Sequence, residues 1–335
     1  MTSGGQGPPA SLAVATPASS HGPRARWTDG LLLGAAGVVG FSGTAPATRV
    51  AAPVFGPVTL TFARIVIAVV LGAVTLAIGG RLRWPGRRHV PALLAMGLGL
   101  AVGYPLFLAL AVQEVPASHA AVDIALIPAA TAVLAAARNR ERLPFAFWLA
   151  CLTGLAAVIG YDLLTGGGIA ARTGDLWLAA AVLSCAVGYV EGALVSRRIG
   201  ATAALCWAMI LLAPAAVPLL VAGVLARPET PISASAWAGL GYVGVISMFL
   251  ASLAWYRGLA AGGTARIGQL NLAQTFLAVG WSVLLLGEHI TWAVPVTAVI
   301  VLCCMAVCLR SAPAHGGGAG SQPEASEDWP STALR

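Results

Sequence analysis

Charged side chains lie inside long apolar stretches of this chain, where burial is costly and each one is therefore a candidate for function. Arg64 and Asp123 lie at similar depths in two of these stretches, roughly 10 Å from the same end at 1.5 Å per residue. They either compensate each other's charge or contact a substrate. His119 lies one helical turn before Asp123 on the same face. Either His119 and Asp123 relay protons together, or His119 is an ordinary histidine at the membrane interface.

Neutral polar side chains are densest at Gln269, Asn271 and Gln274, near the start of a later apolar stretch. Amides donate and accept hydrogen bonds in one site, which suits a zwitterion or polar metabolite; bonds between helices are the structural alternative. Glu191 either serves a site, extends toward the interface or pairs with Arg257. The predicted substrate-binding residues are Gln269, Asn271, Gln274, Asp123, Arg64, Glu191, Tyr104 and His119. The aromatic candidates for the wall of a cavity are Tyr104, Tyr189, Trp207, Tyr242, Trp255 and Tyr256.

The composition indicates that a membrane positions these side chains. Charged residues make up 9% of the 335 residues and hydrophobic residues 58%, whereas a soluble domain has about 25% charged residues. The chain contains 19 arginines and no lysine. The absence of lysine excludes a lysine Schiff base and a P-loop. The six cysteines lie in apolar stretches without C-x-x-C spacing, so we expect packing roles and neither a cofactor nor a metal.

Ten apolar stretches have about the 20 residues that a transmembrane helix needs, and the connections between them are short. The sequence therefore predicts an all-α integral membrane protein with ten transmembrane helices. The predicted spans one to ten cover about 29–51, 57–79, 90–112, 117–137, 145–164, 175–196, 202–224, 235–258, 264–286 and 290–310.

The distribution of arginine between loops predicts the orientation. With the N-terminus inside, the opposite loops hold only Arg49, Arg172 and Arg227, which matches the positive-inside rule. We therefore expect a multi-pass protein of the inner (plasma) membrane with cytoplasmic, disordered tails at 1–28 and 311–335. The arginines that this orientation places on the cytoplasmic side are Arg24, Arg26, Arg81, Arg83, Arg87, Arg88, Arg138, Arg140, Arg142, Arg197, Arg198, Arg266 and Arg310.

The spans fall into two sets of five, which predicts repeats at 29–165 and 174–310. Asp29 opens the first span and Asp175 the sixth, while Glu141 and Glu288 close the fourth and ninth at an offset of 147 residues. Because five is odd, the second repeat must be inverted in the membrane. Inverted repeats place a substrate site between the halves, near the bilayer midplane. Span four is then paired with span nine.

Several short motifs resemble those of EamA-type transporters of the drug/metabolite transporter superfamily, over about 29–310. They are 255–259 (Trp-Tyr-Arg-Gly-Leu), 265–266 (Ala-Arg), 287–288 (Gly-Glu), 64–68 (Arg-Ile-Val-Ile-Ala) and 174–175 (Gly-Asp). The resemblance implies two inverted five-helix repeats, no cofactor, and transport, often export, of small metabolites such as amino acids. The chain departs from that pattern at 138–141, where Arg-Asn-Arg-Glu replaces the usual Gly-Glu.

The leading functional prediction is a secondary transporter that exports a small polar or amphipathic, amino-acid-like solute by alternating access. The alternatives are an integral membrane enzyme, whose usual motifs are missing, and a channel or scaffold, for which no filter loop is evident. The expected partners are the solute and the lipid bilayer, without nucleic acid, in a monomer or homodimer; proton coupling stays open. Arg49 and Arg64 favour an anionic or zwitterionic solute, and Asp123 and Glu191 offset that preference.

Overall fold

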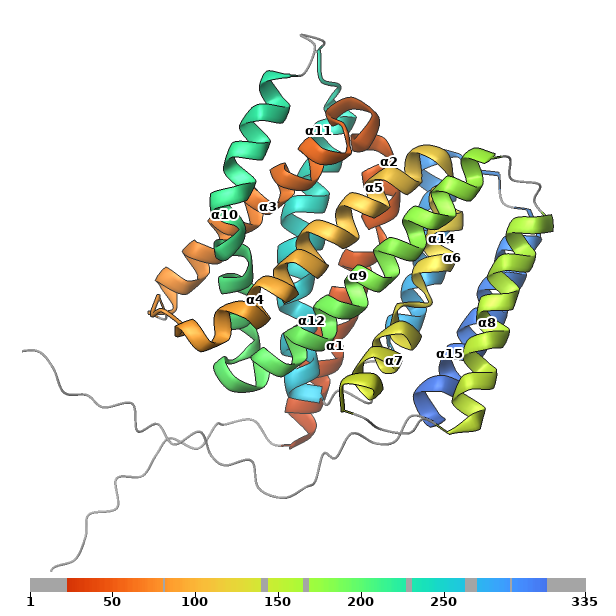
Figure 1. The fold of residues 1–335 in the computed structure, drawn as a ribbon, viewed down its shortest axis with the longest axis horizontal. Helices are drawn as coiled ribbons and strands as arrows, with labels where there is room; N and C mark the ends of the chain where they lie inside the picture. Colours follow the sequence, from red (N-terminus) through yellow and green to blue (C-terminus); the bar gives the residue numbers. More distant parts are fainter. Residues whose placement is uncertain are drawn as a thin grey trace, which may run out of the picture.

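The structure is a computed structural model that describes residues 23–80, 82–139, 144–164, 169–226, 231–262, 270–289 and 291–311. Every regular element in these ranges is a helix (Figure 1). Seven helical stretches are long and apolar enough to cross a membrane: Thr28–Phe55, Pro57–Ile78, Arg87–Glu114, Ala117–Arg138, Thr173–Ile199, Ala201–Leu225 and Ala234–Gly258. Shorter apolar helices cover Phe145–Ala157, Ala273–Leu286 and Ala293–Cys304, so each of the ten predicted spans has a helical counterpart.

Several spans consist of consecutive helical segments. The first five spans contain α1 (Pro23–Ser42) and α2 (Thr44–Phe55); α3 (Pro57–Ile78); η1 (Arg87–His89), α4 (Val90–Gly97), η2 (Leu98–Gly103) and α5 (Tyr104–Glu114); α6 (Ala117–Ile124) and α7 (Ile127–Asn139); and α8 (Phe145–Leu164). The last five contain α9 (Ile169–Ile199); α10 (Ala201–Leu225); α11 (Ala234–Gly241), η3 (Tyr242–Ala251) and α12 (Ser252–Gly262); α14 (Asn271–Leu286); and α15 (Ala293–Ser311).

Glycines make the sharp turns where two of these spans end. Gly56 has φ 77° between α2 and α3, and Pro57 then begins α3 at a position where its missing N–H costs nothing. Gly287 adopts the left-handed conformation (φ 63°) at the end of α14. Such turns keep the connections short.

The principal helix contacts each join one helix from the first half to one from the second. Helix α1 packs against α12, α5 against α9, α3 against α10, and α8 against α15 (Figure 1). Spans one and six hold the same position in their halves, as do spans three and eight. Span one contacts span eight, and span six contacts span three, so the pattern of helix contacts is the same when the two halves are exchanged. Helix α1 begins at the lower end of the bundle in Figure 1, whereas α9 begins at the upper end.

Two of these contacts are close enough to bring helix backbones together. A Cβ atom added at Gly99 of η2 would lie 2.5 Å from the Ser184 carbonyl oxygen and 2.7 Å from the Gly188 nitrogen, both on α9. The matching contact between α12 and α1 brings Gly258 against Gly34, with the added Cβ 2.7 Å from the Gly34 nitrogen. Small residues permit this close packing, on which helix association in lipid depends.

The π-helical segments also occupy matching places, with η2 in span three and η3 in span eight. Pro105 lies at the second position of α5, directly after η2, and Pro128 lies at the second position of α7, after the break that ends α6. Pro214 and Pro218 in span seven lie inside α10, which continues through both. In a membrane, neighbouring groups can satisfy the backbone that a proline leaves unbonded, so a helix can continue.

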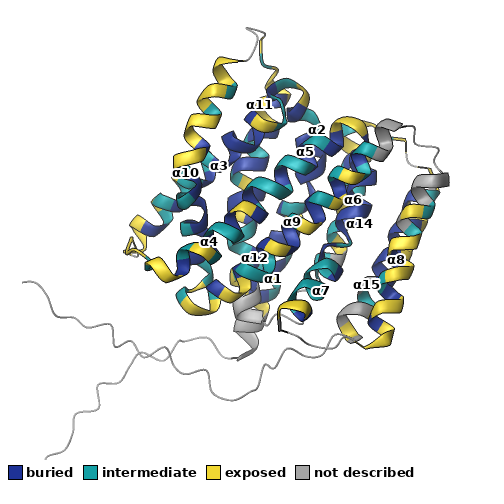
Figure 2. Cartoon of the chain, in the orientation of Figure 1, coloured by how far each residue is buried: buried dark blue, intermediate teal, exposed yellow. Residues whose placement is uncertain are grey.

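Burial confirms that the bundle is built for lipid. Buried residues face the centre, while exposed residues follow the outward faces of α8 and α10 (Figure 2). Leu149, Leu152 and Leu155 of α8 are exposed, as are Val221 and Val224 of α10. An apolar surface this continuous is foreign to a monomeric soluble protein. The chain is a multi-pass membrane protein.

Candidate functional site

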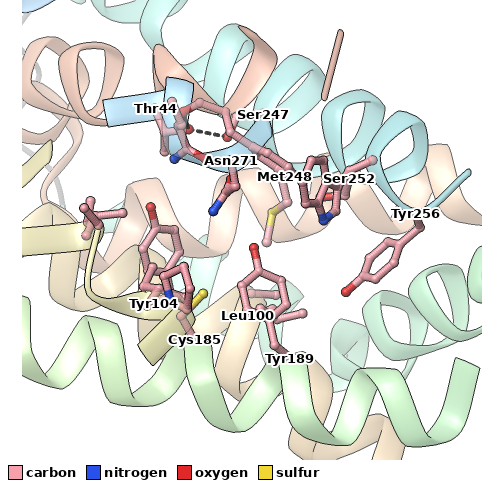
Figure 3. A pocket seen from close by; sticks show the side chains of 18 of the residues that line it. Thr44, Leu100, Tyr104, Cys185, Tyr189, Ser247, Met248, Ser252, Tyr256 and Asn271 are labelled. Atoms are coloured by element: carbon pink, nitrogen blue, oxygen red, sulfur yellow. Dashed lines mark hydrogen bonds between the residues drawn. The ribbon is translucent and has the colours of Figure 1, made fainter. Parts of the chain in front are cut away.

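A cavity of about 80 Å³ lies at the centre of the bundle, with walls from both halves. Phe41, Met209, Met248 and Trp255 are among its apolar lining residues. Figure 3 shows the rings of Tyr104 and Tyr189 and the amide of Asn271 pointing toward the same space. The polar residues that line the cavity are Thr44, Arg64, Tyr104, Tyr189, Ser247, Ser252, Tyr256, Asn271, Gln274 and Thr275.

Arg64 is the charged residue in this lining. It lies on α3 and is only 3% exposed, and its Nε has no hydrogen-bond partner among the residues that the structure describes. Tyr104 interacts with it electrostatically. Within the described ranges Arg64 also forms no ion pair. A buried guanidinium with free donor capacity can bind a carboxylate that enters the cavity.

The remaining polar groups join the two halves around Arg64. The hydroxyls of Thr44 on α2 and Ser247 on η3 are hydrogen-bonded at 2.6 Å (Figure 3). The buried hydroxyl of Tyr256 has no partner among the described residues. Phe41 and Trp255 pack edge to face with their ring centroids 6.4 Å apart, so an aromatic wall stands beside the polar groups. This combination fits a small amphipathic solute.

Of the predicted site residues, the structure brings together Arg64, Tyr104, Asn271 and Gln274, all of which line the cavity. Gln269 lies outside the described residues. Asp123, His119 and Glu191 do not line the cavity. Of the aromatic candidates, Tyr189, Trp255 and Tyr256 also line the cavity, whereas Trp207 and Tyr242 do not. Sequence reasoning missed the lining hydroxyls, because single hydroxyls in apolar helices carry no spacing signal.

The predicted ion pair between Arg64 and Asp123 is wrong. The Asp123 Oδ2 atom lies 3.8 Å from the His119 Nε2 atom, and the same nitrogen lies 3.1 Å from Oδ1 of Asp175 on α9. The physical reason is helix rotation: Ile124 and Ala125 of the same helical stretch face the cavity, so Asp123 points to another side. Asp175 was noticed in the sequence only as the residue that opens span six.

Glu191 pairs with Arg138 on α7, with 3.1 Å between Oε1 and Nη2. Arg257 was the partner considered from the sequence. The sequence did not reveal that α7 packs against α9, which brings Arg138 to Glu191. Arg138 is more than half exposed, so the pair contributes little stability. Glu191 is therefore part of a helix contact near one end of the bundle.

Glu288 has a role that sequence reasoning did not assign. Its two carboxylate oxygens accept hydrogen bonds from the backbone amides of Ala117 (2.8 Å) and Ser118 (3.0 Å) at the start of α6. An anion at a helix N-terminus satisfies unbonded amides and complements the helix dipole. Glu288 thereby connects the end of α14 to the start of α6, across the two halves. The available signal was the Gly-Glu pair that closes span nine.

We expect Glu288→Gln to lower the thermal stability of the purified protein, with a loss of about 1 kcal/mol, because the neutral amide offers one oxygen to two amides. The measurement is the Tm in detergent. Glu114→Gln is the matched control, since Glu114 is an exposed glutamate at the end of α5. An equal Tm for Glu288→Gln and the control would contradict a capping role.

Comparison with known proteins decides the family. The model of the EamA-like transporter family matches residues 28–161 and 172–310. This chain belongs to the EamA-like transporter family. The predicted resemblance is thus confirmed, and both matched regions of this EamA-like transporter contribute to the cavity, Arg64 and Tyr104 from the first and Tyr189 and Asn271 from the second.

Relatives of this EamA-like transporter are also transporters by name. The uncharacterized transporter YdeK of Bacillus subtilis (strain 168) is 39% identical over 287 residues, covering 85% of this chain and 98% of YdeK. A protein of Streptantibioticus cattleyicolor is named as a probable terminal-alkyne amino-acid exporter. It is 28% identical over 221 residues, which cover 65% of this chain and 72% of the exporter's length. A crystal structure with 22% identity and a TM-score of 0.58 covers 85% of this chain and 98% of that one, which shows the shared fold.

Proposed function

We propose that this EamA-like transporter exports a small amino-acid-like metabolite by alternating access. The observation that carries the proposal is Arg64, a buried guanidinium without an ion-pair partner among the described residues, in a cavity walled by both halves. The carboxylate of an amino acid would accept two parallel hydrogen bonds from it. The solute's apolar side chain would pack against Phe41 and Trp255.

The rest of the lining favours a zwitterion over a simple anion. Asn271 and Gln274 offer carbonyl oxygens, and Tyr189 and Tyr256 offer hydroxyls, which together can accept hydrogen bonds from an ammonium group. The Trp255 ring can also attract a cation by its π face. Export is the direction that the family resemblance suggests, and the Streptantibioticus relative is named as an amino-acid exporter.

The size of the cavity supports alternating access. About 80 Å³ holds several water molecules, far less than the roughly 300–1,000 Å³ of sites that enclose a drug-sized ligand. A solute of amino-acid size therefore needs the walls to separate, first toward one side of the membrane and then toward the other. Such rocking of one bundle against another about a central site is typical of transporters with internal repeats.

The proposal includes the topology. We take 29–165 and 174–310 as two inverted five-helix repeats, supported by the exchange-symmetric helix contacts and by the matching places of η2 and η3. The connection from α3 to α4 and the end of α9 lie at the same end of the bundle as the start of α1 (Figure 1). These segments carry Arg83, Arg87, Arg88, Arg197 and Arg198. By the positive-inside rule, that end is cytoplasmic in the inner membrane.

The test is counterflow in proteoliposomes. We expect labelled L-leucine or L-phenylalanine to enter saturably and faster when the same unlabelled amino acid is trapped inside, since a carrier exchanges its solute across one site. Tetraethylammonium, a cation without a carboxylate, is the control solute and should not be carried. Linear, non-saturable flux would identify a channel instead, and carriage of tetraethylammonium without amino acids would overturn the substrate class.

A further inference from the structure

Three ionisable side chains converge on the side of α6 that faces α9, away from the cavity. The His119 Nε2 atom lies 3.1 Å from Asp175 Oδ1 and 3.8 Å from Asp123 Oδ2. One imidazole nitrogen and one carboxylate oxygen from each aspartate all lie within 4.8 Å of one another. The side chains of His119 and Asp123 are only 7% and 8% exposed, whereas that of Asp175 is 25% exposed. The cluster is therefore buried, with one carboxylate accessible near the end of the bundle where α9 begins.

We infer that His119, Asp123 and Asp175 form a proton-binding site that controls how the cavity opens toward the outer side of the membrane. This inference rests on the proposed function and deepens it by naming a second ligand, the proton, which the outer solution supplies through Asp175. The proton binds the imidazole and leaves by the same route. No other group is transferred.

The geometry links the proton to helix movement. A protonated His119 attracts both carboxylates and thus holds α6 against α9, one helix from each half. When the proton leaves, the neutral imidazole no longer attracts either carboxylate, and in a buried setting this lost attraction is one that solvent screens only weakly. Proton binding therefore stabilises the closed contact at this end, and proton release favours its opening.

The same contact forms part of the cavity wall. Ile124 and Ala125 directly follow Asp123 in the chain and line the cavity, as does Cys185, which lies on α9 further along from Asp175. A shift of α6 relative to α9 therefore moves two walls of the solute site. Because coupling between two sites is reciprocal, solute binding must change proton affinity as much as the proton changes solute affinity.

The charged side chains that the structure describes around this cluster are bonded elsewhere or exposed. From α2, Arg49 donates hydrogen bonds to the carbonyl oxygens of Val112 and Val115, and the Glu288 carboxylate at the end of α14 is bonded to the amides at the start of α6. On α5, Glu114 is exposed, as is His289 beyond α14. Arg310 on α15 is exposed at the far end of that helix.

The test uses native Cys185 as a reporter, because it lines the cavity and is buried. Intact cells that contain the full chain are treated with a membrane-impermeant methanethiosulfonate, and mass spectrometry measures the rate of Cys185 modification. Between external pH 6 and 8, the rate relative to that in His119→Gln should rise at least roughly fivefold, the lower end of typical coupling between sites. Dividing by the variant's rate removes the pH dependence of the thiol reaction itself.

The control variants separate the cluster from its surroundings. Asp175→Asn should behave like His119→Gln, since it removes the carboxylate that α9 contributes. His289→Gln replaces an exposed histidine at the same end and should keep the wild-type response. A pH-independent ratio, or no Cys185 modification at either pH, would overturn the inference, as would a stoichiometric divalent metal ion retained by the purified protein and lost in Asp123→Asn.

Amino-acid counterflow distinguishes this inference from the proposed function. If the pH response of Cys185 is present but neither amino acid is carried, the substrate class fails and the proton site stands. If amino acids are carried while the Cys185 ratio stays constant, the proton site fails and the substrate class stands. When both hold, the pH profile of counterflow should flatten in His119→Gln.

Discussion

Replacing Arg64 with leucine is expected to reduce amino-acid counterflow by roughly 10- to 100-fold, the effect of losing a hydrogen bond to a charged group. The Tm in detergent should stay the same or rise. Arg64 forms no ion pair among the described residues, so its removal leaves no opposite charge unpaired, and a buried charge is replaced by an apolar side chain. Loss of transport with a retained Tm would separate substrate binding from a structural role.

Arg64→Lys is the matched variant for this prediction. Lysine keeps the positive charge but lacks the planar fork that binds a carboxylate through two parallel hydrogen bonds. We expect partial transport with a raised KM for the amino acid. If Arg64→Leu instead prevents folding while Arg64→Lys behaves as wild type, the guanidinium has a structural role and the substrate assignment is wrong.

Gly99→Ala is expected to destabilise the protein strongly, although it adds a single methyl group. The new Cβ would meet the Ser184 carbonyl oxygen at 2.5 Å and the Gly188 nitrogen at 2.7 Å, and both are backbone atoms that cannot rotate away. Overpacking of this kind costs about 1–3 kcal/mol or more, so we expect a Tm decrease on the order of 5 °C or more. The measurement is thermal unfolding in detergent.

Gly280→Ala is the control, because an added Cβ at Gly280 of α14 has no heavy atom within 4 Å. Alanine favours helices by about 1 kcal/mol over glycine, so this variant should be as stable as the parent or slightly more stable. If both variants unfold at the same temperature, the contact between η2 and α9 is looser than the structure shows.

The fold was largely predictable because the thickness of the bilayer sets both the length and the hydropathy of a transmembrane helix. The segment boundaries inside spans were not predictable, since the break after Ser42 and the π-helical segments depend on contacts with other helices. Proline gave a mixed signal for the same reason. The residue type is identical at Pro128, which follows a break in the helix, and at Pro214, where the helix continues, so only the surroundings decide the outcome.

The site was predictable only where a residue type is unusual in lipid. Arg64 and Asn271 were found because polar groups in apolar helices are rare, and both line the cavity. The same reasoning selected Asp123 and His119 but could not determine their side of the helix, and so it paired Asp123 with the wrong partner. Asp175 and Glu288 lie at span ends, where acidic residues are common, and only the structure shows what each contacts.

The interlocked arrangement of the helices has a consequence for how the chain is made. Translation delivers the first five spans before any of their principal partners exist, because α1, α3, α5 and α8 pack against helices that are synthesised later. The nascent first half therefore enters the bilayer with its Gly34 and Gly99 surfaces still facing lipid. The contacts that join the halves form only once α9 and the later helices have been made. We therefore expect a chain that is cut short between the halves to lack these contacts and to be degraded faster by membrane proteases than the full chain.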